Sequence, residues 1–361
     1  MVPPPLAATL RATRRAARLA LRRRVAIGPA LGAGLVAVAL AGCGGGEDGE
    51  VTGGGEGRLG EPTRATLVLD FLPNAVHAGI YRSLADGCYA DRNIELEIVE
   101  PTSTADTLKL IDAGKADFGI ADGIDVAGQI DQGRGAKGIM AVVQRPLGGV
   151  IALRESGIRD PGGLEGRTVG VTGVPSDGAV LDALVDAAGA DRSEVETVTI
   201  GFNGVQALEN RKVDAFTGYV AADGTQVSQD GFPIVSFPLD EYGGPRYPGL
   251  VMFSTEERIA EAPELIGAMV DCTVEGYERT IDDPRASLRD LLGEVPGLDE
   301  ELASAQLHAY LPLLEAGAGR YGAFNPDDLE SLSSFLVDSD LASEPIDPDR
   351  YATNEFVPGA G

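Results

Sequence analysis

The segment from Leu67 to Tyr81, LVLDFLPNAVHAGIY, gathers side chains that could bind a small polar ligand. An apolar run ends at Asp70, a Pro-Asn turn follows, and His77 stands where a helix should begin. The first backbone N–H groups of a helix have no partner within it and favour nearby acceptor groups. Asp70, Asn74 and His77 add side chains that form directional hydrogen bonds. We predict a ligand site at this strand end; the alternative is an ordinary turn followed by a surface histidine.

Two further helix starts carry polar side chains. Asp122 precedes a helix expected from Ile124 to Gln132, and Ser176 lies in the segment GVPSDG from Gly173 to Gly178. A hydroxyl group and small residues at a helix N-terminus can hold the polar tail of a ligand. The alternative for both residues is a simple helix cap, so they are secondary candidates.

The elements that must position these residues alternate along the chain. From Thr63 onward, short runs rich in β-branched residues alternate with helical stretches, which is typical of βαβ units and a mostly parallel sheet. A Gly/Pro break from Asp160 to Gly166 follows two extended runs, and we place the crossing into a second lobe there. The alternation then repeats, and after Thr255 the pattern becomes almost wholly helical.

An internal echo supports two similar lobes. IDAGKADFGI from Ile111 resembles LENRKVDAFT from Leu208, and in both a helix ends near a Lys and enters a strand through Lys-x-Asp. We therefore expect an α/β protein of two lobes, each a mostly parallel sheet flanked by helices, with a ligand cleft at the carboxyl ends of the strands. The expected divisions are residues 63–155 for the first lobe, 156–250 for the second, and 251–361 for the return to the first lobe and the C-terminal helices.

The balance of charges excludes some partners. The 361 residues include 56 acidic and 29 basic ones, with a formal net charge of −27. A surface so acidic repels phosphate backbones, so we expect no nucleic-acid partner. The hydrophobic content of 43% excludes disorder throughout.

The N-terminal residues have the order of an export signal. Seven arginines precede an uncharged run from Val25 to Gly42, which ends at Cys43. Leu40 to Cys43 resembles the bacterial lipobox, so residues 1–42 are expected to be a signal peptide and Cys43 the lipidated residue. A transmembrane anchor is the alternative. The Gly-rich residues that follow, up to position 62, are expected to form a tether between Cys43 and a fold that starts near Thr63.

Two cysteines remain, Cys88 and Cys272, and they are 184 positions apart. Neither has the spacing of a zinc site or a redox motif, and we expect no metal. In an exported protein they could pair and join an early helix to a late one, or stay as two buried thiols. The sequence leaves this open, because the separation of their Cα atoms decides it.

The opening segment resembles the motif LDW-x-PN-x-x-H-x-G-x-Y of the bacterial binding proteins for thiamine pyrimidine precursors, which are solute receptors of ABC importers related to eukaryotic pyrimidine synthases. Similar segments follow in order: a GKADF-type segment from Gly114, a GF-x-x-VQAL…KVDA-x-TG segment from Gly201, YPG from Tyr247 and GYE from Gly276. Together they cover most of residues 65–278, and riboflavin-binding relatives share the opening motif.

This resemblance implies a type II periplasmic binding protein whose lobes close on a small heteroaromatic ligand. It places Asp70 and Phe71 on the floor of the cleft, Asn74 and His77 at its edge, and Tyr219 with Asp223 on the facing wall. Phe71, Tyr219 and Tyr247 are the candidates for stacking on the ligand. A carboxylate suits an exocyclic amine or a protonated ring nitrogen.

Two departures affect the expected ligand. The family's Trp is Phe71 in this chain, and Asp223 stands where relatives tend to have Glu. The shorter carboxylate would hold the same ligand at a different reach, or a bulkier ligand instead. The resemblance implies a thiamine pyrimidine precursor as the ligand, with riboflavin or another heterocycle as the alternative. The resemblance also implies permease and ATPase partners, a monomer, and a location on the extracytoplasmic face of the cell membrane.

The patterns of an enzyme are missing from the sequence. His77 and His308 are the only histidines, and no nucleophile elbow, zinc-protease motif or phosphate-binding loop occurs. The Cys-rich signature of the eukaryotic synthases is also missing. We expect neither catalysis nor a cofactor. An adhesin or scaffold would explain the lipid anchor but not the motif from Leu67 to Tyr81.

Overall fold

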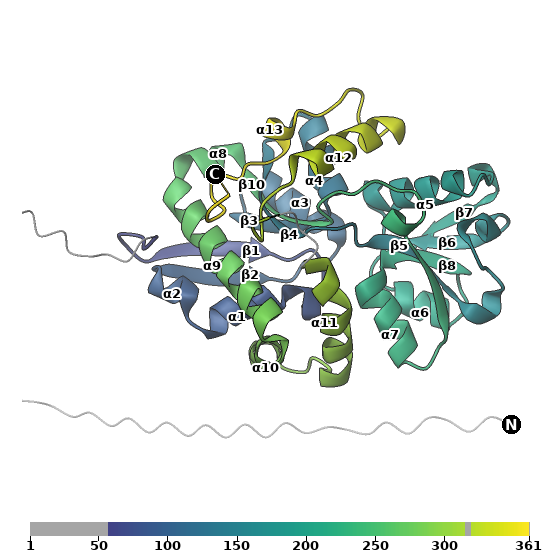
Figure 1. Ribbon diagram of the computed structural model, residues 1–361, viewed down its shortest axis with the longest axis horizontal. Coiled ribbons are helices and arrows are strands. Elements are labelled where there is room, and N and C mark those ends of the chain that lie inside the picture. Colours follow the sequence, from purple (N-terminus) through teal and green to yellow (C-terminus); the bar gives the residue numbers. More distant parts are fainter. Residues whose placement is uncertain (1–56, 315–318, 361) are drawn as a thin grey trace, which may run out of the picture. The chain divides into compact units, whose positions relative to one another are not determined.

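A computed structural model describes residues 57–314 and 319–360, and these form two five-stranded sheets flanked by helices (Figure 1). The strand order is β2-β1-β3-β10-β4 in the first sheet and β7-β6-β8-β5-β9 in the second. The strands of the first sheet are β1 (Thr63–Val68), β2 (Ile94–Val99), β3 (Phe118–Ala121), β4 (Ala136–Val143) and β10 (Leu250–Thr255). Those of the second are β5 (Gly148–Leu153), β6 (Thr168–Val171), β7 (Glu196–Thr199), β8 (Ala215–Tyr219) and β9 (Ile234–Pro238).

Both sheets are built in the same way. In the first, β1 runs parallel to β2 and β3, while β10 lies antiparallel between β3 and β4. In the second, β6 runs parallel to β7 and β8, while β5 lies antiparallel between β8 and β9. This arrangement confirms the predicted pair of mostly parallel lobes with like topology.

The internal echo corresponds to equivalent positions in the two lobes. Asp117 precedes β3, and its Oδ2 accepts the N–H of Thr66 in β1 at 2.8 Å. Asp214 precedes β8, and its Oδ2 accepts the N–H of Thr168 in β6 at 2.9 Å. Each aspartate also donates its own backbone N–H to the carbonyl of the same threonine. The Lys-x-Asp pattern therefore marks the same strand entry in both lobes.

Helices follow most strands and cover the sheets (Figure 1). In the first lobe they include η1 (Ala75–His77), α1 (Ala78–Ala85), α2 (Cys88–Asp91), α3 (Thr104–Asp112) and α4 (Gly123–Asp131). Between β5 and β9 they are η2 (Arg154–Ser156), η3 (Pro161–Leu164), α5 (Pro175–Ala187), η4 (Arg192–Glu194), α6 (Gly204–Glu209), η5 (Val220–Gly224) and α7 (Thr225–Gln229). After η6 (Leu239–Glu241) and β10 come α8 (Glu256–Glu261), α9 (Pro263–Asp282), α10 (Pro284–Glu294), α11 (Glu300–Leu314), α12 (Pro326–Asp338) and α13 (Pro348–Tyr351), as the helical pattern predicts.

The first sheet is buried on both faces, which explains the near-continuous apolar runs of its strands. In β10, Met252 belongs to the core that contains Ile80 of α1 and Met269 of α9. Its neighbours Val251 and Phe253 belong to the opposite core, which also contains residues of α4 and α12. Successive side chains of a strand point to opposite faces, so one strand serves both cores.

The crossing into the second lobe lies earlier than the sequence indicated. β5 pairs with β8 and β9 of the second sheet, so the chain crosses at residues 144–147, between β4 and β5. The Gly/Pro break at residues 160–166 lies within the second lobe and forms η3. The expected end of the first lobe at residue 155 is therefore wrong. The prediction assigned both extended runs before the break to the first lobe, whereas only β4 belongs to the first sheet and β5 belongs to the second.

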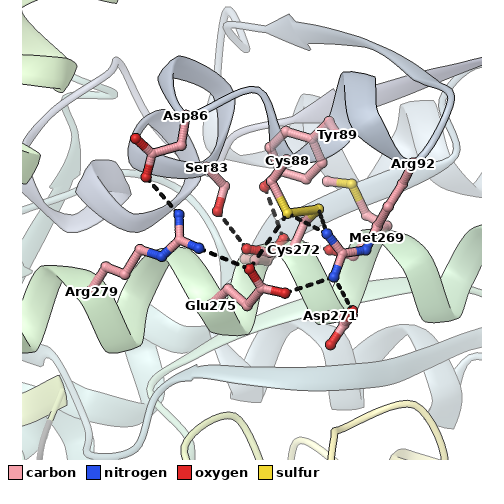
Figure 2. The surroundings of a disulfide bond; sticks show 11 residues. Ser83, Asp86, Cys88, Tyr89, Arg92, Met269, Asp271, Cys272, Glu275 and Arg279 are labelled. Carbon is pink, nitrogen blue, oxygen red and sulfur yellow. Dashed lines mark hydrogen bonds and ion pairs between the residues drawn. A yellow bond between two sulfur atoms is a disulfide. The ribbon is translucent and has the colours of Figure 1, made fainter. Parts of the chain in front are cut away.

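Cys88 and Cys272 form a disulfide that joins α2 to α9, with their Cα atoms 5.8 Å apart (Figure 2). Figure 2 shows Arg92 beside the sulfur atoms, paired with the carboxylates of Asp271 and Glu275 on α9. A hydroxyl contact of 3.0 Å between Tyr89 and Thr273 links the same helices. The pairing that the sequence left open is therefore present.

The fold begins before Thr63. Leu59 is buried, its N–H donates to the carbonyl of Arg92, and its own carbonyl accepts from the side chain of Asn93. The expected tether therefore ends before residue 59 rather than at 62. The expected signal peptide and Cys43 lie outside the described residues. Of the helices in the described part of the chain, none is both long and apolar enough to cross a membrane.

Candidate functional site

A cavity of about 90 Å³ lies between the two lobes. The first lobe contributes the link from β1 to η1 and the first turn of α4, and the second contributes the start of α5, the start of α6 and the end of β8 with η5. The lining residues are Asp70, Phe71, Asn74, Asp125, Thr172, Val174, Ser176, Asp177, Gly201, Phe202, Gly204, Phe216, Thr217, Gly218, Tyr219, Ala222 and Asp223. This is the position, beyond the carboxyl ends of parallel strands, at which open α/β sheets bind ligands.

Asp70 is fixed in place by His77. The Oδ1 atom of Asp70 lies 2.8 Å from Nε2 of His77, and Nδ1 of His77 accepts the backbone N–H of Asn74 at 3.2 Å. Since Nδ1 is an acceptor, the hydrogen-bond network assigns the proton to Nε2, which donates to Asp70. His77 is completely buried and does not line the cavity. It therefore orients the carboxylate of Asp70 and leaves Oδ2 for the cavity.

Asn74 explains the Pro-Asn turn of the opening motif. Its Oδ1 accepts the N–H of Val76 at 2.9 Å and caps η1, while its Nδ2 donates to the carbonyl of Leu72 at 3.1 Å. These bonds satisfy the end of the short helix. Asn74 is thus part of an ordinary turn, as the alternative interpretation states, and it also lines the cavity.

Asp177 organises the facing wall. Its Oδ2 accepts the backbone N–H groups of Thr172 and Gly173 and the hydroxyl of Thr172, at 2.6 to 3.0 Å. Its Oδ1 accepts the hydroxyl of Thr217 in β8 at 2.8 Å. A carboxylate at the start of a helix is favoured there by the helix dipole and the unpaired N–H groups. Asp177 therefore holds the loop before α5 against β8.

Asp125 and Ser176 join the two lobes. The two oxygens of Asp125, on α4, accept the N–H of Ser176 at 3.1 Å and its hydroxyl at 2.8 Å, on α5. Burial raises the pKa of Asp125 to about 7, against the opposing effect of the bonds from Ser176. This carboxylate therefore titrates near neutral pH while it bridges the lobes.

Asp223 lies in η5, just after β8. Its Oδ2 accepts the backbone N–H of Tyr219 at 2.8 Å. Withdrawal from water raises the pKa of Asp223 to about 6, and it raises the pKa of Tyr219 well above its usual value, so that the phenol stays neutral. Asp223 and Tyr219 thus present a carboxylate and an aromatic ring to the cavity from the second lobe.

Two phenylalanines meet across the cavity. The rings of Phe71, from the first lobe, and Phe202, from the second, lie edge to face with centroids 4.3 Å apart. Such pairs contribute about 0.5–1.5 kcal/mol beyond their buried area. They add apolar surface to a lining that also contains four aspartates.

Six of the nine sequence candidates line the cavity and three do not. Those that line it are Asp70, Phe71, Asn74, Ser176, Tyr219 and Asp223. Asp122 instead caps α4, where its Oδ1 accepts the N–H of Ile124 at 2.9 Å, as its alternative interpretation states. Tyr247 is completely buried in the core that also contains Tyr351, and His77 acts behind Asp70. Tyr247 is thus not among the residues that line the cavity.

Sequence reasoning missed several lining residues, notably Asp125, Asp177 and Phe202. Asp177 lies in the segment GVPSDG and Phe202 in the segment GF-x-x-VQAL. The carboxylate of the first and the aromatic ring of the second are the sequence signals that mark them as possible ligand contacts. Asp125 stands one turn after Asp122, and only the rotation of α4 decides which of the two faces the second lobe.

A metal site is not found among the residues that the structure describes, since no three His, Cys, Asp or Glu side chains are arranged to hold an ion. The cavity offers instead hydrogen-bond acceptors and aromatic rings. This set can bind a small ring that carries N–H donors.

The chain is similar to several known proteins. The family described as "NMT1/THI5 like" matches residues 74–287, more than half of the chain. A formylaminopyrimidine-binding protein of Halalkalibacterium halodurans is 28% identical over 286 residues, which cover 78% of this chain and 86% of the relative. A 4-amino-5-hydroxymethyl-2-methylpyrimidine phosphate synthase of Legionella pneumophila is 25% identical over 82% of this chain and 93% of its own.

A riboflavin-binding protein, RibY of Chloroflexus aurantiacus, is 26% identical over 83% of this chain and 88% of its own. Among solved structures, the alkanesulfonate-binding protein SsuA of Xanthomonas axonopodis pv. citri matches with a TM-score of 0.64 at 13% identity and covers 81% of this chain and 97% of its own. That likeness shows the fold of a periplasmic binding protein. With the extent of the family match, it follows that the chain belongs to the NMT1/THI5-like family and has the periplasmic-binding-protein fold.

Proposed function

We propose that this protein is the extracytoplasmic solute receptor of an ABC importer and that it captures a thiamine pyrimidine precursor. The observation that carries the proposal is the cavity between the lobes, where Asp70 and Asp223 face a common space from opposite sides. An aminopyrimidine offers exocyclic and ring N–H groups to carboxylates and a flat face to aromatic rings. Phe71, Phe202 and Tyr219 supply those rings.

The size of the cavity favours a single ring over riboflavin. Its volume is about 90 Å³, against the ~300–1,000 Å³ of pockets for drug-sized ligands. A substituted pyrimidine is much smaller than a flavin, which has three fused rings and a ribityl chain. A flavin would require the lobes to open further and would break the Phe71–Phe202 contact.

Capture follows from contacts that span the lobes. The Asp125–Ser176 bonds, the Phe71–Phe202 pair and a bond of 3.2 Å from Gln306 of α11 to the carbonyl of Ala222 join them in this closed form. A ligand that touches both lobes binds this form better than an open one, so it shifts the population toward closure. A permease can then distinguish loaded from empty receptors by shape.

The enzyme alternative, a pyrimidine synthase, has little support in the cavity. Its described lining contains no cysteine, and both ring nitrogens of His77 are engaged in hydrogen bonds. Neither Ser176 nor Thr172 is hydrogen-bonded to a base of the Ser-His type, because both donate to aspartates that already hold backbone groups. We therefore infer that the protein binds its ligand without transforming it.

Attachment to the membrane is proposed to depend on lipid at Cys43, with residues 1–42 removed. The permease and the ATPase would be its protein partners, and the receptor would act as a monomer. Mass spectrometry of the protein from membranes would show a diacylglyceryl mass on Cys43 and its loss in Cys43→Ser. An intact residue 1–42 segment would contradict this part of the proposal.

A thermal-shift panel tests the ligand class. The chain from Gly44 onward is titrated with formylaminopyrimidine, riboflavin, an alkanesulfonate and amino acids. A ligand that binds only the folded protein stabilises it by about 2.7 kcal/mol at a hundredfold excess over Kd. A shift with the pyrimidine alone supports the proposal, a shift with riboflavin alone selects the alternative, and a well-folded protein that responds to neither refutes both.

A further inference from the structure

The cavity collects negative charge without a matching positive side chain. Asp70 and Asp125 come from the first lobe, Asp177 and Asp223 from the second, and the described lining includes no Lys or Arg. Asp70 is 5% exposed and Asp125 2%. Carboxylates withdrawn from water are costly unless a cation or enough donors compensate them.

Two of the eight oxygens of these four carboxylates have no hydrogen-bond donor among the residues that the structure describes. Asp177 and Asp125 use both oxygens, on backbone and hydroxyl donors of the second lobe. Asp70 uses Oδ1 for His77, and Asp223 uses Oδ2 for the N–H of Tyr219. Within the described part of the chain no hydrogen bond reaches Oδ2 of Asp70 or Oδ1 of Asp223. Asp70 and Asp223 belong to opposite lobes, and both residues line the same cavity.

We propose that the cavity binds its ligand as a cation, a protonated amino-substituted nitrogen heterocycle whose N–H groups donate to Asp70 and Asp223. This inference rests on the proposed function and specifies the protonation state of the ligand. Two charge-assisted bonds to carboxylates of different lobes would hold the lobes together more strongly than bonds from a neutral ring. The net charge of −27 also attracts a cation toward the protein before it binds.

The proton balance is simple. In alkaline solution the heterocycle is neutral, and on binding a ring-nitrogen lone pair takes one proton from water or buffer. The bound ring then carries one positive charge, and no bond between heavier atoms forms or breaks. When the pH of the solution is above the pKa of the free ligand, binding is therefore coupled to the uptake of one proton.

Titratable groups of the protein around the cavity could also make binding depend on pH, so their protonation must be distinguished from that of the ligand. They are Asp70, His77, Asp122, Asp125, Asp177, Tyr219, Asp223, Tyr247, Tyr277 and Tyr310. With pKa values of about 7 for Asp125 and about 6 for Asp223, both are largely ionised from pH 8 upward. Burial raises the pKa values of Tyr219 and Tyr310 far enough to keep both phenols neutral. Burial also raises the pKa of Asp122, so Asp122→Asn serves as a control background.

The test compares two rings of similar shape by calorimetric titration of the purified protein at pH 8 and pH 9. One is 4-amino-5-hydroxymethyl-2-methylpyrimidine, and the other is its 4-methoxy counterpart, which neither gains nor loses a proton in this pH range. Absorbance titration supplies the pKa of the free aminopyrimidine. The affinity for the amino compound should fall about tenfold from pH 8 to pH 9, both in the wild-type protein and in Asp122→Asn. The affinity for the counterpart should not change. Heats in phosphate and Tris buffers should show the uptake of one proton.

Each outcome decides a different question. If the amino compound binds equally well at pH 8 and pH 9, the ligand is bound neutral, and the inference is wrong while the proposed function stands. If neither ring binds to the folded protein, the proposed function fails and this inference fails with it. Asp223→Asn should reduce the tenfold dependence, whereas Asp186→Asn, the same change on the exposed side of α5, should preserve it.

Discussion

Removal of the Cys88–Cys272 disulfide should lower the stability of the protein by several kcal/mol. The perturbation is the double variant Cys88→Ser/Cys272→Ser. The two cysteines are 184 positions apart, and the chain between them includes the whole second lobe. In the chain-entropy account, closing a loop of this length destabilises the unfolded state by about 5 kcal/mol at 25 °C. We expect a measured loss of about 3–5 kcal/mol.

The native contacts around the disulfide should survive in this variant. Arg92 on the segment after α2 keeps its ion pairs with Asp271 and Glu275, and Tyr89 keeps its hydroxyl contact with Thr273 (Figure 2). The folded variant should therefore keep α2 on α9. Its unfolded chain is more expanded, so the dependence of the unfolding free energy on urea should become steeper.

Urea unfolding followed by circular dichroism measures both quantities for the oxidised protein, the reduced protein and the double variant. The reduced protein and the variant should agree. A loss below about 1 kcal/mol would show that the disulfide contributes little to stability, and two free thiols in the oxidised protein by thiol titration would show that it does not form; either result contradicts this prediction.

Further predictions concern packing, ligand binding and pH. Gly276→Ala should destabilise the protein by ~1–3 kcal/mol or more in urea unfolding, because the added Cβ would lie 2.0 Å from the carbonyl oxygen of Gly79. Gly267→Ala is the control on the same helix. Its added Cβ has its nearest contact at 3.8 Å, so this variant should be neutral or stabilising. His77→Ala should weaken pyrimidine binding in calorimetry, because Asp70 loses the bond that orients it; unchanged affinity would remove His77 from the account. Burial raises the pKa of Asp125 to about 7, so the folded protein binds more protons than the unfolded chain from about pH 4 to 7, and stability falls as pH rises through this range, by up to ~1.4 kcal/mol per unit. Asp125→Asn should remove this part of the slope in unfolding at pH 5, 6 and 7, and a slope that stays the same would contradict the assignment.

Local sequence features predicted what local geometry decides. Asp70 lies two residues after β1, His77 lies at the junction of η1 and α1, and the turn between them brings the two side chains to 2.8 Å. The Lys-x-Asp repeat predicted two lobes of like topology because each aspartate closes the same hydrogen bonds between neighbouring strands. Such short-range patterns carry their own geometry.

Long-range geometry was beyond the sequence. The antiparallel strand β5 pairs with strands that lie later in the chain, so the crossing at residues 144–147 carries no local mark. Asp122 and Asp125 both stand at the start of α4, but only the rotation of that helix turns Asp125 toward Ser176. The disulfide depends on how α2 docks on α9, two helices far apart in the sequence, and no spacing pattern around either cysteine predicts that docking.

Binding of the pyrimidine in the cavity between the lobes can be tested by calorimetric titration of the wild-type protein, Asp70→Asn and Asp131→Asn with formylaminopyrimidine. Asp131 is an exposed acid on α4 and provides the matched control. We expect the wild-type protein and the control to bind with equal affinity. Asp70→Asn should lose about 2 kcal/mol, roughly thirtyfold, because a charge-assisted bond is replaced by a neutral one. Equal affinity in all three proteins would show that the pyrimidine does not bind in the cavity between the lobes.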